Sequence, residues 1–445
     1  MPQAAKHHHR NHVIEPKRIP RAEHSISRSQ ISPGTLKVLY TLKDAGYEAY
    51  MVGGGVRDLL AGLKPKDFDI ATNAHPEQVQ PLFRSCRLVG RRFVICHVRM
   101  GNEISEVTTF RGPITDSHER DETGRILSDN EYGTLEQDAF RRDFTINALY
   151  YDIRDFSIVD FANGLEDLHH RTVRLIGDPE LRFREDPVRM LRAVRIANKL
   201  GFQIAPETLA PMPRLAHLLQ EIPAARLFDE VLKILMGREA LPNFESLRQH
   251  RLFQQMFPQT EACFDDAKSL KFVRLALENT ADRIARELPV SPAFLYAALL
   301  WPPVWRRTQD LIQRQGHHQN VALSQASEEV LARAIQHVAI PKRFSVPMRE
   351  IWQLQPRFDQ RQSGRAKRLM THPRFRAAYD FLLLRMVAGD VSEELCEWWT
   401  KAQIGSDLPV LPQTEKMEGE APTPRKRRRR RGGKNRHRAA APPAE

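Results

Sequence analysis

The segment VGGGVRDLLAG at residues 52–62 is followed closely by KDFDIAT at residues 66–72. The apolar run Ala49 to Val52 predicts a strand that enters a tight turn at the three glycines. Val56 to Ala61 predicts a short helix that ends at the next glycine, and Asp67 to Ala71 predicts a second strand. This order of elements indicates a mixed α/β unit.

Two carboxylates alternate with two apolar residues in the second strand. Asp67 and Asp69 should therefore face one way, while Phe68 and Ile70 face the core. Two oxygen ligands this close suit Mg²⁺, which usually takes a few carboxylates and completes its coordination with water and substrate phosphates. The pattern alone is weak, since about seven acid-x-acid pairs are expected by chance with 55 acids in 445 residues. Its place after the glycine turn makes it informative.

The glycine turn has two interpretations. Glycines let the backbone approach a phosphate, and the helix that follows offers amide donors. Arg57 can bridge a phosphate or lock the turn. Taken alone, three glycines more often form an ordinary turn. Paired with the DFD strand, they predict a nucleotide-binding turn at Gly53 and Gly54.

Outward from this unit the chain divides into a mixed part and a helical part. Ser32-Pro33 predicts a helix start, and residues 92–100 and 103–110 flank Gly101-Asn102 as a predicted β-hairpin. From Leu181 onward strand signals nearly vanish, and apolar residues recur every three or four positions. Breaks in the helical part are expected near Pro242, Pro258, Pro302 and Pro341. The expected fold class is α+β.

The net charge of +13 favours a polyanionic partner. It lies at the ends, since residues 425–445 carry a net +9 and residues 1–30 a net +4, which leaves residues 31–424 balanced. Both ends are poor in large apolar residues, so we expect disordered arms. Such a tail usually neutralises phosphates whatever their sequence. A solubilising end and a weak contact with anionic lipid are the alternatives.

Two features bear on the compartment. No stretch approaches the roughly 20 uncharged apolar residues of a membrane span, and residues 1–21 lack the apolar run of a signal peptide. Four cysteines without CxxC spacing argue against a disulfide framework and a thiolate zinc site. A soluble cytoplasmic protein is expected.

Three further segments accompany the opening motif: EVTTFRG at 106–112, RRDFTINALYY at 141–151 and REDPVRMLRAVR at 184–195. Together they resemble the nucleotidyltransferase superfamily, in the class II branch shared by bacterial poly(A) polymerases and CCA-adding enzymes. The segments stand in the family's order and cover the head and the start of the helical part.

The resemblance implies roles for particular residues. Asp67 and Asp69 would be metal ligands, with Glu106 or Asp143 as the third carboxylate. The strand that carries Glu106 could lie beside the DFD strand and present Glu106 from the same face. For any one of these residues, a structural salt bridge or helix cap is the competing role.

Nucleotide recognition is implied for two other motifs. Arg142 and Asn147 match the RRD motif, which in the family holds the ribose. Asp186 and Arg189 match the base-recognition motif, in which a carboxylate accepts from the adenine amino group and a guanidinium donates to a ring nitrogen. Glu185 and Asp186 also suit a helix N-terminus, and both roles are compatible.

The implied activity is transfer of AMP from ATP to an RNA 3′-hydroxyl without a template, at a two-metal Mg²⁺ site for which Mn²⁺ is an alternative. LVGRRFVICHV at 88–98 and IPAARLFDEVLKIL at 222–235 resemble the poly(A) polymerase forms. CCA-adding enzymes usually carry an ERI-type sequence at the second place. The alternatives are a CCA-adding enzyme and an RNA-binding protein on an inactive fold.

The expected partners are RNA 3′ ends, ATP, and either RNA-decay proteins or an RNA chaperone, and the chain is expected to be a monomer. The polar segment at 113–135 is either a lid over the nucleotide or an insertion. The expected domains are a disordered basic arm (1–30), a nucleotidyltransferase head (31–165), a helical neck with the base-recognition and RNA-binding region (166–240), a helical RNA-binding body (241–404), and a linker with an Arg-rich tail (405–445).

Overall fold

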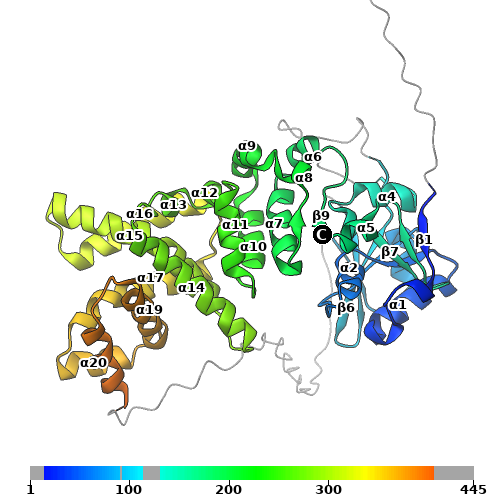
Figure 1. The fold of residues 1–445 in the computed structure, drawn as a ribbon. Coiled ribbons are helices and arrows are strands. Elements are labelled where there is room, and N and C mark those ends of the chain that lie inside the picture. Colours follow the sequence, from blue (N-terminus) through cyan, green and yellow to red (C-terminus); the bar gives the residue numbers. More distant parts are fainter. Residues whose placement is uncertain (1–14, 91–92, 114–130, 405–445) are drawn as a thin grey trace, which may run out of the picture. The chain divides into compact units, whose positions relative to one another are not determined.

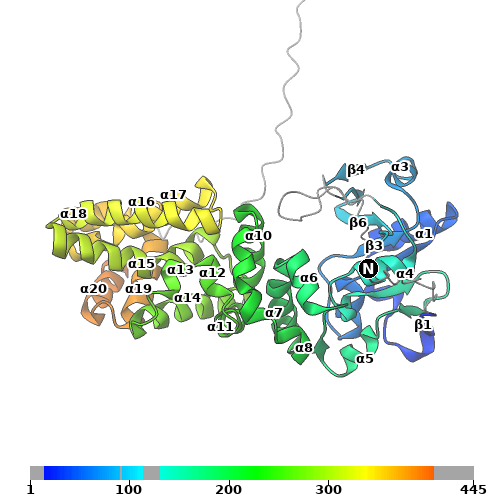
Figure 2. The ribbon, with the colours of Figure 1, turned by 90° about the horizontal axis from the view of Figure 1, so that it is seen from above.

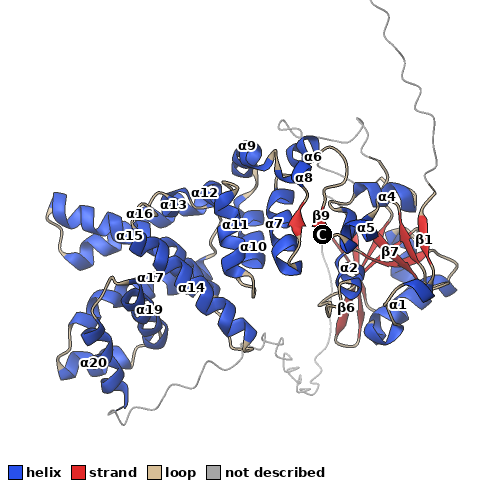
Figure 3. Ribbon diagram, in the orientation of Figure 1, coloured by secondary structure: helices blue, strands red, loops and turns tan. Residues whose placement is uncertain are grey.

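A computed structural model describes residues 15–90, 93–113 and 131–404. Strands occur in the first half of this range, and helices alone make up the remainder (Figure 3). This division confirms the predicted α+β class. The predicted arm up to residue 14, the central part of the predicted lid and the predicted linker and tail lie outside the described residues.

The head is built on an eight-stranded mixed sheet in the order β1-β8-β7-β2-β3-β6-β5-β4. A short parallel pair, β9 with β10, follows it. The strands are β1 Lys17–Ile19, β2 Ala49–Val52, β3 Asp69–Thr72, β4 Cys86–Val89, β5 Ile95–Met100, β6 Glu103–Thr109, β7 Leu149–Asp152, β8 Ile158–Asp160, β9 Thr172–Val173 and β10 Gln203–Ile204.

Helices cover both faces of the sheet, as Figures 1 and 2 show. They are α1 Pro33–Asp44, α2 Gly54–Leu60, α3 Pro76–Val79, α4 Leu135–Arg141 and α5 Gly164–His169. The central strand β2 is buried along its whole length, because Met51 packs into the core with α1 while Tyr50 packs into the core with α4. Burial on two sides explains why this strand reads as an unbroken apolar run.

Several sequence predictions hold to within a residue or two. The hydroxyl of Ser32 caps α1 by accepting from Thr35 N at 3.2 Å, and β5 and β6 form the predicted antiparallel hairpin. Two element starts differ, since α2 begins at Gly54 and β3 at Asp69. The second and third glycines therefore form the first turn of the helix.

The predicted disordered arm is wrong for its last residues. Lys17–Ile19 pairs antiparallel with β8, and Ile19 and Ile26 are buried in the core beneath α1. Two isoleucines in a polar segment were enough to anchor it, because a neighbouring strand edge was available to satisfy its backbone.

The helical part continues from the head through α6 Pro179–Glu185 and α7 Val188–Leu200. One hydrophobic core joins residues from Phe144 to Ala388, so no separate core marks the predicted boundary at 240/241. Both predicted boundaries, 165/166 and 240/241, stay predictions.

The following helices are α8 Pro206–Leu209, α9 Met212–Leu215, α10 Ala224–Leu235, α11 Ala240–Gln249, α12 Phe253–Met256, α13 Pro258–Glu261, α14 Ala267–Ala285, α15 Pro292–Gln315, α16 Gln319–His337, α17 Lys342–Leu354, α18 Ser363–Met370, α19 Phe375–Ala388 and α20 Glu393–Ile404.

The predicted break at Pro302 does not occur, because α15 runs through both Pro302 and Pro303. A proline inside a helix leaves the carbonyl four residues earlier without its usual donor. For Pro303 that carbonyl belongs to Leu299, and the buried hydroxyl of Thr260 donates to it at 2.9 Å. A tertiary hydrogen bond therefore replaces the missing helical one.

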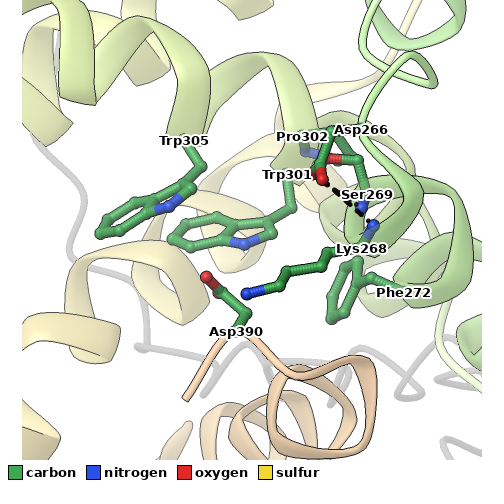
Figure 4. A pocket seen from close by; sticks show the side chains of 8 residues that line it. All are labelled: Asp266, Lys268, Ser269, Phe272, Trp301, Pro302, Trp305 and Asp390. Atoms are coloured by element: carbon green, nitrogen blue, oxygen red, sulfur yellow. Dashed lines mark hydrogen bonds between the residues drawn. The ribbon is translucent and has the colours of Figure 1, made fainter.

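Near this site the helical part has a small pocket of about 110 Å³ (Figure 4). Trp301 and Trp305 stack there with ring centres 5.3 Å apart, and the guanidinium of Arg385 lies over both rings. Ligand pockets for nucleotide-sized molecules are usually about 300 Å³ or more. We therefore interpret this pocket as packing. Within the described ranges, no helix has the length and hydropathy to cross a membrane.

The hydrogen bond from Thr260 to the Leu299 carbonyl predicts that substituting Thr260 costs more stability than substituting Thr308. Thr260→Val should lower the free energy of unfolding of the helical part by about 1–3 kcal/mol, because the Leu299 carbonyl would stay buried without a donor. Tryptophan fluorescence during chemical denaturation measures this, since all five tryptophans lie between residues 301 and 399.

Thr308→Val is the matched control. Its hydroxyl donates to Val304 within α15 at 2.7 Å, and that carbonyl also has the ordinary helical donor. A smaller loss, below about 1 kcal/mol, is expected there. Equal losses of unfolding free energy in the two variants would contradict the conclusion that Thr260 replaces the missing helical donor.

Candidate active site

Two parallel strands bring two acidic residues side by side. In the pairing of β3 with β6, Asp69 lies opposite Glu106 and Ile70 opposite Val107. Ile70 and Val107 are buried in the core on the α1 side, so Asp69 and Glu106 share the other face. Asp67 stands two residues earlier and is exposed. The predicted common face of Asp69 and Glu106 is confirmed.

Burial and neighbouring acids perturb the ionisation of Asp69. Burial and then the neighbouring charge of Glu106 raise the pKa of Asp69 to about 6, while Arg142 opposes the shift and Asp67 adds to it. Within the described part of the chain, no donor hydrogen-bonds to the carboxylates of Asp67 or Asp69. The negative charges of Asp69 and its acidic neighbours repel one another, and a bound divalent cation would relieve this repulsion.

The predicted third metal ligand, Glu106, pairs with a histidine instead. No group of three or more His, Cys, Asp or Glu side chains among the described residues lies close enough together to hold a metal ion. Glu106 is 49% exposed, and its Oε1 lies 3.5 Å from Nε2 of His97 on β5. The donor types thus fit Mg²⁺, but Glu106 would have to leave His97 or bind through water.

The glycine turn lies against these carboxylates. Gly53 has φ 75° and ψ −135°, a conformation that other residues rarely adopt. A Cβ at Gly53 would stand 3.3 Å from Nη1 of Arg142 and 3.8 Å from Oδ2 of Asp69. At Gly55 a Cβ would stand 3.1 Å from the ring of Phe68. Side chains on these glycines would push the turn away from the DFD segment.

Arg57 locks the turn, which is one of its two predicted roles. Its buried guanidinium donates to Asp58 Oδ1 through Nε at 2.9 Å and through Nη2 at 2.6 Å. Its Nη1 donates to Asn147 Oδ1 at 2.7 Å. Three of its five N–H groups are thereby engaged within the protein.

Asp143 is fully engaged by the protein. It accepts from Arg192 Nε at 2.7 Å, Asn147 Nδ2 at 3.0 Å and Phe144 N at 2.9 Å. Burial opposes its ionisation, but the nearby charge of Arg192 and these hydrogen bonds hold the pKa of Asp143 well below its usual value. Of the two predicted third ligands, Glu106 therefore has the freer oxygens.

Arg142 is aimed at the glycine turn by a buried partner that the motif comparison did not single out. Its Nη2 donates to Asp138 Oδ2 at 3.0 Å, and its Nε donates to the hydroxyl of Tyr150 at 2.9 Å. Asp138 on α4 is only 1% exposed. This support leaves Nη1 of Arg142 beside Gly53.

The base-recognition residues stand at the junction of α6 and α7. Asp186 accepts from Val188 N at 3.2 Å and from Arg226 Nη2 at 2.7 Å. Arg189 donates through Nη1 to the Arg182 carbonyl at 2.6 Å and to Glu185 Oε2 at 2.9 Å. The predicted helix-terminal role of Asp186 is therefore present, and contact with a base stays a prediction.

Two cations on α7 were not predicted from the sequence to belong to the site. Lys199 Nζ lies 2.6 Å from Asp58 Oδ2, and Arg192 binds Asp143 as described above. The signal was available, because the basic residues at 192 and 199 are two helical turns apart and share one face. Their acidic partners lie far away in sequence, so spacing alone could not identify them.

Comparison with known proteins supplies the family. Three sequence profiles match: "Poly A polymerase head domain" at residues 49–174, "Probable RNA and SrmB- binding site of polymerase A" at 201–264 and "Polymerase A arginine-rich C-terminus" at 315–435. Poly(A) polymerase I of Salmonella typhi is 49% identical over 420 residues, which cover 92% of this chain and 90% of that protein.

CCA-adding enzymes match less of the sequence. That of Levilactobacillus brevis is 42% identical over 219 residues, 49% of this chain and 53% of the relative. The crystal structure of the Bacillus stearothermophilus CCA-adding enzyme in complex with CTP superimposes with a TM-score of 0.56 and 27% identity, covering 84% of this chain and 82% of that one. The chain therefore belongs to the poly(A) polymerase family of nucleotidyltransferases.

Proposed function

We propose that this protein adds AMP from ATP to RNA 3′ ends without a template. The observation that carries the proposal is the near full-length similarity to a protein named Poly(A) polymerase I, together with acidic residues at the positions of the family's metal ligands. In the reaction the RNA 3′-oxygen bonds to the α-phosphorus, the bond to the β-phosphate breaks, pyrophosphate leaves, and the hydroxyl proton passes to solvent.

Asp67, Asp69 and Glu106 would hold Mg²⁺, with Mn²⁺ as an alternative. When bound, two such ions lower the pKa of the attacking hydroxyl and stabilise the departing pyrophosphate. Asp143, already held by Arg192 and Asn147, would keep the RRD segment in place beside them.

The remaining residues bind the nucleotide. The turn at Gly53 and Gly54 lets the backbone approach the triphosphate, and Nη1 of Arg142 offers it a positive charge. Asn147 would orient the ribose once its bond to Arg57 is exchanged. Asp186 and Arg189 would recognise the adenine edge, in place of their present bonds to Arg226 and Glu185.

In the cell this activity would tag RNA for processing and decay in the cytoplasm, with RNA-decay proteins or an RNA chaperone as partners of a monomeric enzyme. The division into head, neck and body at 165/166 and 240/241 belongs to the same proposal.

The carboxylate site predicts a selective loss. Asp69→Ala should abolish AMP transfer even in saturating Mg²⁺, while RNA binding stays within about twofold of the original protein, because the charge removed serves the metal rather than the RNA. Primer extension and filter binding measure the two properties. Asp44→Ala, an exposed acid at the end of α1, should leave both unchanged. Normal turnover by the Asp69 variant would refute the site.

Nucleotide choice separates the proposal from the CCA-adding alternative. Purified protein would be given ATP or CTP separately, with either generic RNA or transfer RNA that lacks its end. We expect A addition to both RNAs and negligible C addition. Efficient C addition to the transfer RNA would favour a CCA-adding enzyme, and equal results with and without divalent cation would favour an inactive RNA-binding fold.

The terminal charge predicts a salt effect. Removing residues after Pro424 takes away a net +9, so RNA affinity should fall and log K should depend less steeply on log salt. Adenylation at high RNA concentration should persist. A tail with lysine in place of every arginine keeps the charge and should restore affinity. Full affinity without the tail would contradict this prediction.

A further inference from the structure

A second concentration of positive charge lies inside the helical part. Residues 342–376 contain ten Lys or Arg and two acids, a net charge of +8. The apparent balance of residues 31–424 therefore conceals a basic segment set against an acidic remainder. This segment is distinct from the tail, because it folds as α17, the short helix η6 Gln355–Asp359, α18 and the start of α19.

Most of these cations have no acidic partner among the described residues. Three of them pair with acids, namely Arg361 with Glu394, Arg374 with Glu350 and Arg376 with Asp380. In the described part of the chain, no ion pair is found for the other seven. These seven, called the basic surface below, are Lys342, Arg343, Arg349, Arg357, Arg365, Lys367 and Arg368. Six are exposed and Arg349 is partly exposed.

The packing beneath the basic surface holds it in place. On α18, Ala366 and Leu369 are buried in a core that also contains Trp399, so the helix presents Arg365, Lys367 and Arg368 to solvent. On a helix this short and this basic, like charges repel and only tertiary packing keeps the helix formed. A bound polyanion would relieve that repulsion.

The basic surface starts beside α10. At the start of α17, the ring of Phe344 stacks on Phe228 of α10 with centroids 5.7 Å apart, and Ala339 N donates to the carbonyl of Ala224 at 3.0 Å. From there α17 leads through η6 to α18 (Figure 2). Helix α10 also carries Arg226, the partner of Asp186.

We propose that the basic surface binds the phosphate backbone of single-stranded RNA upstream of the 3′ end that is extended. The inference deepens the proposed function and rests on it for the identity of the polyanion. Lysine and arginine without partners bind phosphates whatever the base sequence, which suits an enzyme that must hold different transcripts. Because α17 starts against α10, RNA held there would lead toward the base-recognition residues.

The test uses the full-length chain with three substitutions on α18, Arg365→Ala, Lys367→Ala and Arg368→Ala. Loss of three phosphate contacts should make the slope of log K against log salt shallower by about 2 for long single-stranded RNA. KM for long RNA should rise at least several-fold. For a primer of a few nucleotides, too short to reach α18, kcat/KM should stay unchanged.

The matched control removes three exposed cations from other helices, Lys37→Ala, Lys43→Ala and Lys271→Ala. It lowers the net charge equally, so equal losses in both variants would overturn the proposal by showing a general charge effect. An unchanged salt slope for the α18 variant would also overturn it. Tryptophan fluorescence monitors folding, and glutamine substitutions at the same three positions replace alanine if the melting transition shifts.

Two further binding measurements distinguish RNA from other polyanions as the ligand of the basic surface. Loss of binding to vesicles rich in anionic lipid, with RNA binding intact, would overturn the proposal in favour of a membrane surface. Loss of binding to an acidic polypeptide alone would favour a protein partner instead. If the original protein fails to adenylate RNA, the proposed function fails, but the salt slope still decides whether the basic surface binds RNA.

Discussion

One face of α7 fastens the helical part to the head through two ion pairs, Lys199 with Asp58 and Arg192 with Asp143. Both acids are largely withdrawn from water, so leaving either without its partner would be costly. Arg57 and Asn147 join the two acids from the head side and close a circuit of hydrogen bonds. The position of Asp186 and Arg189 relative to the glycine turn depends on this circuit, since Arg189 lies in the first turn of α7.

The carboxylates of the candidate site and the basic segment at 342–376 lie in different parts of the sequence, as a polyanionic substrate would require. The carboxylates on β3 and β6 repel a polyanion, and burial followed by the charge of Glu106 raises the pKa of Asp69. Attraction for RNA would therefore have to come from other residues, and the proposed roles of the tail and of the basic surface would supply it. A metal ion placed between the carboxylates and the phosphates would remove the remaining conflict.

The helical part shows how tertiary contacts override local rules. Pro302 and Pro303 would end an isolated helix, yet α15 continues, and Thr260 from α13 donates to the carbonyl that Pro303 leaves without its helical donor. Near the N-terminus, Ile19 and Ile26 anchor a segment whose composition indicates disorder, because β8 offers an open edge. In both cases, a group distant in the chain satisfies a backbone polar atom.

Sequence by itself determined the features that depend on neighbouring residues. Short-range periodicity and turn chemistry account for strand β2, the positive φ at Gly53, the cap at Ser32 and the hairpin of β5 with β6. The motifs indicated the family. Only the tertiary structure decided that Glu106 has freer oxygens than Asp143, that Arg57 locks the turn, and that seven cations of residues 342–376 have no ion pair among the described residues. These outcomes depend on which charges meet across long stretches of chain, and side-chain spacing along a sequence carries no information about such encounters.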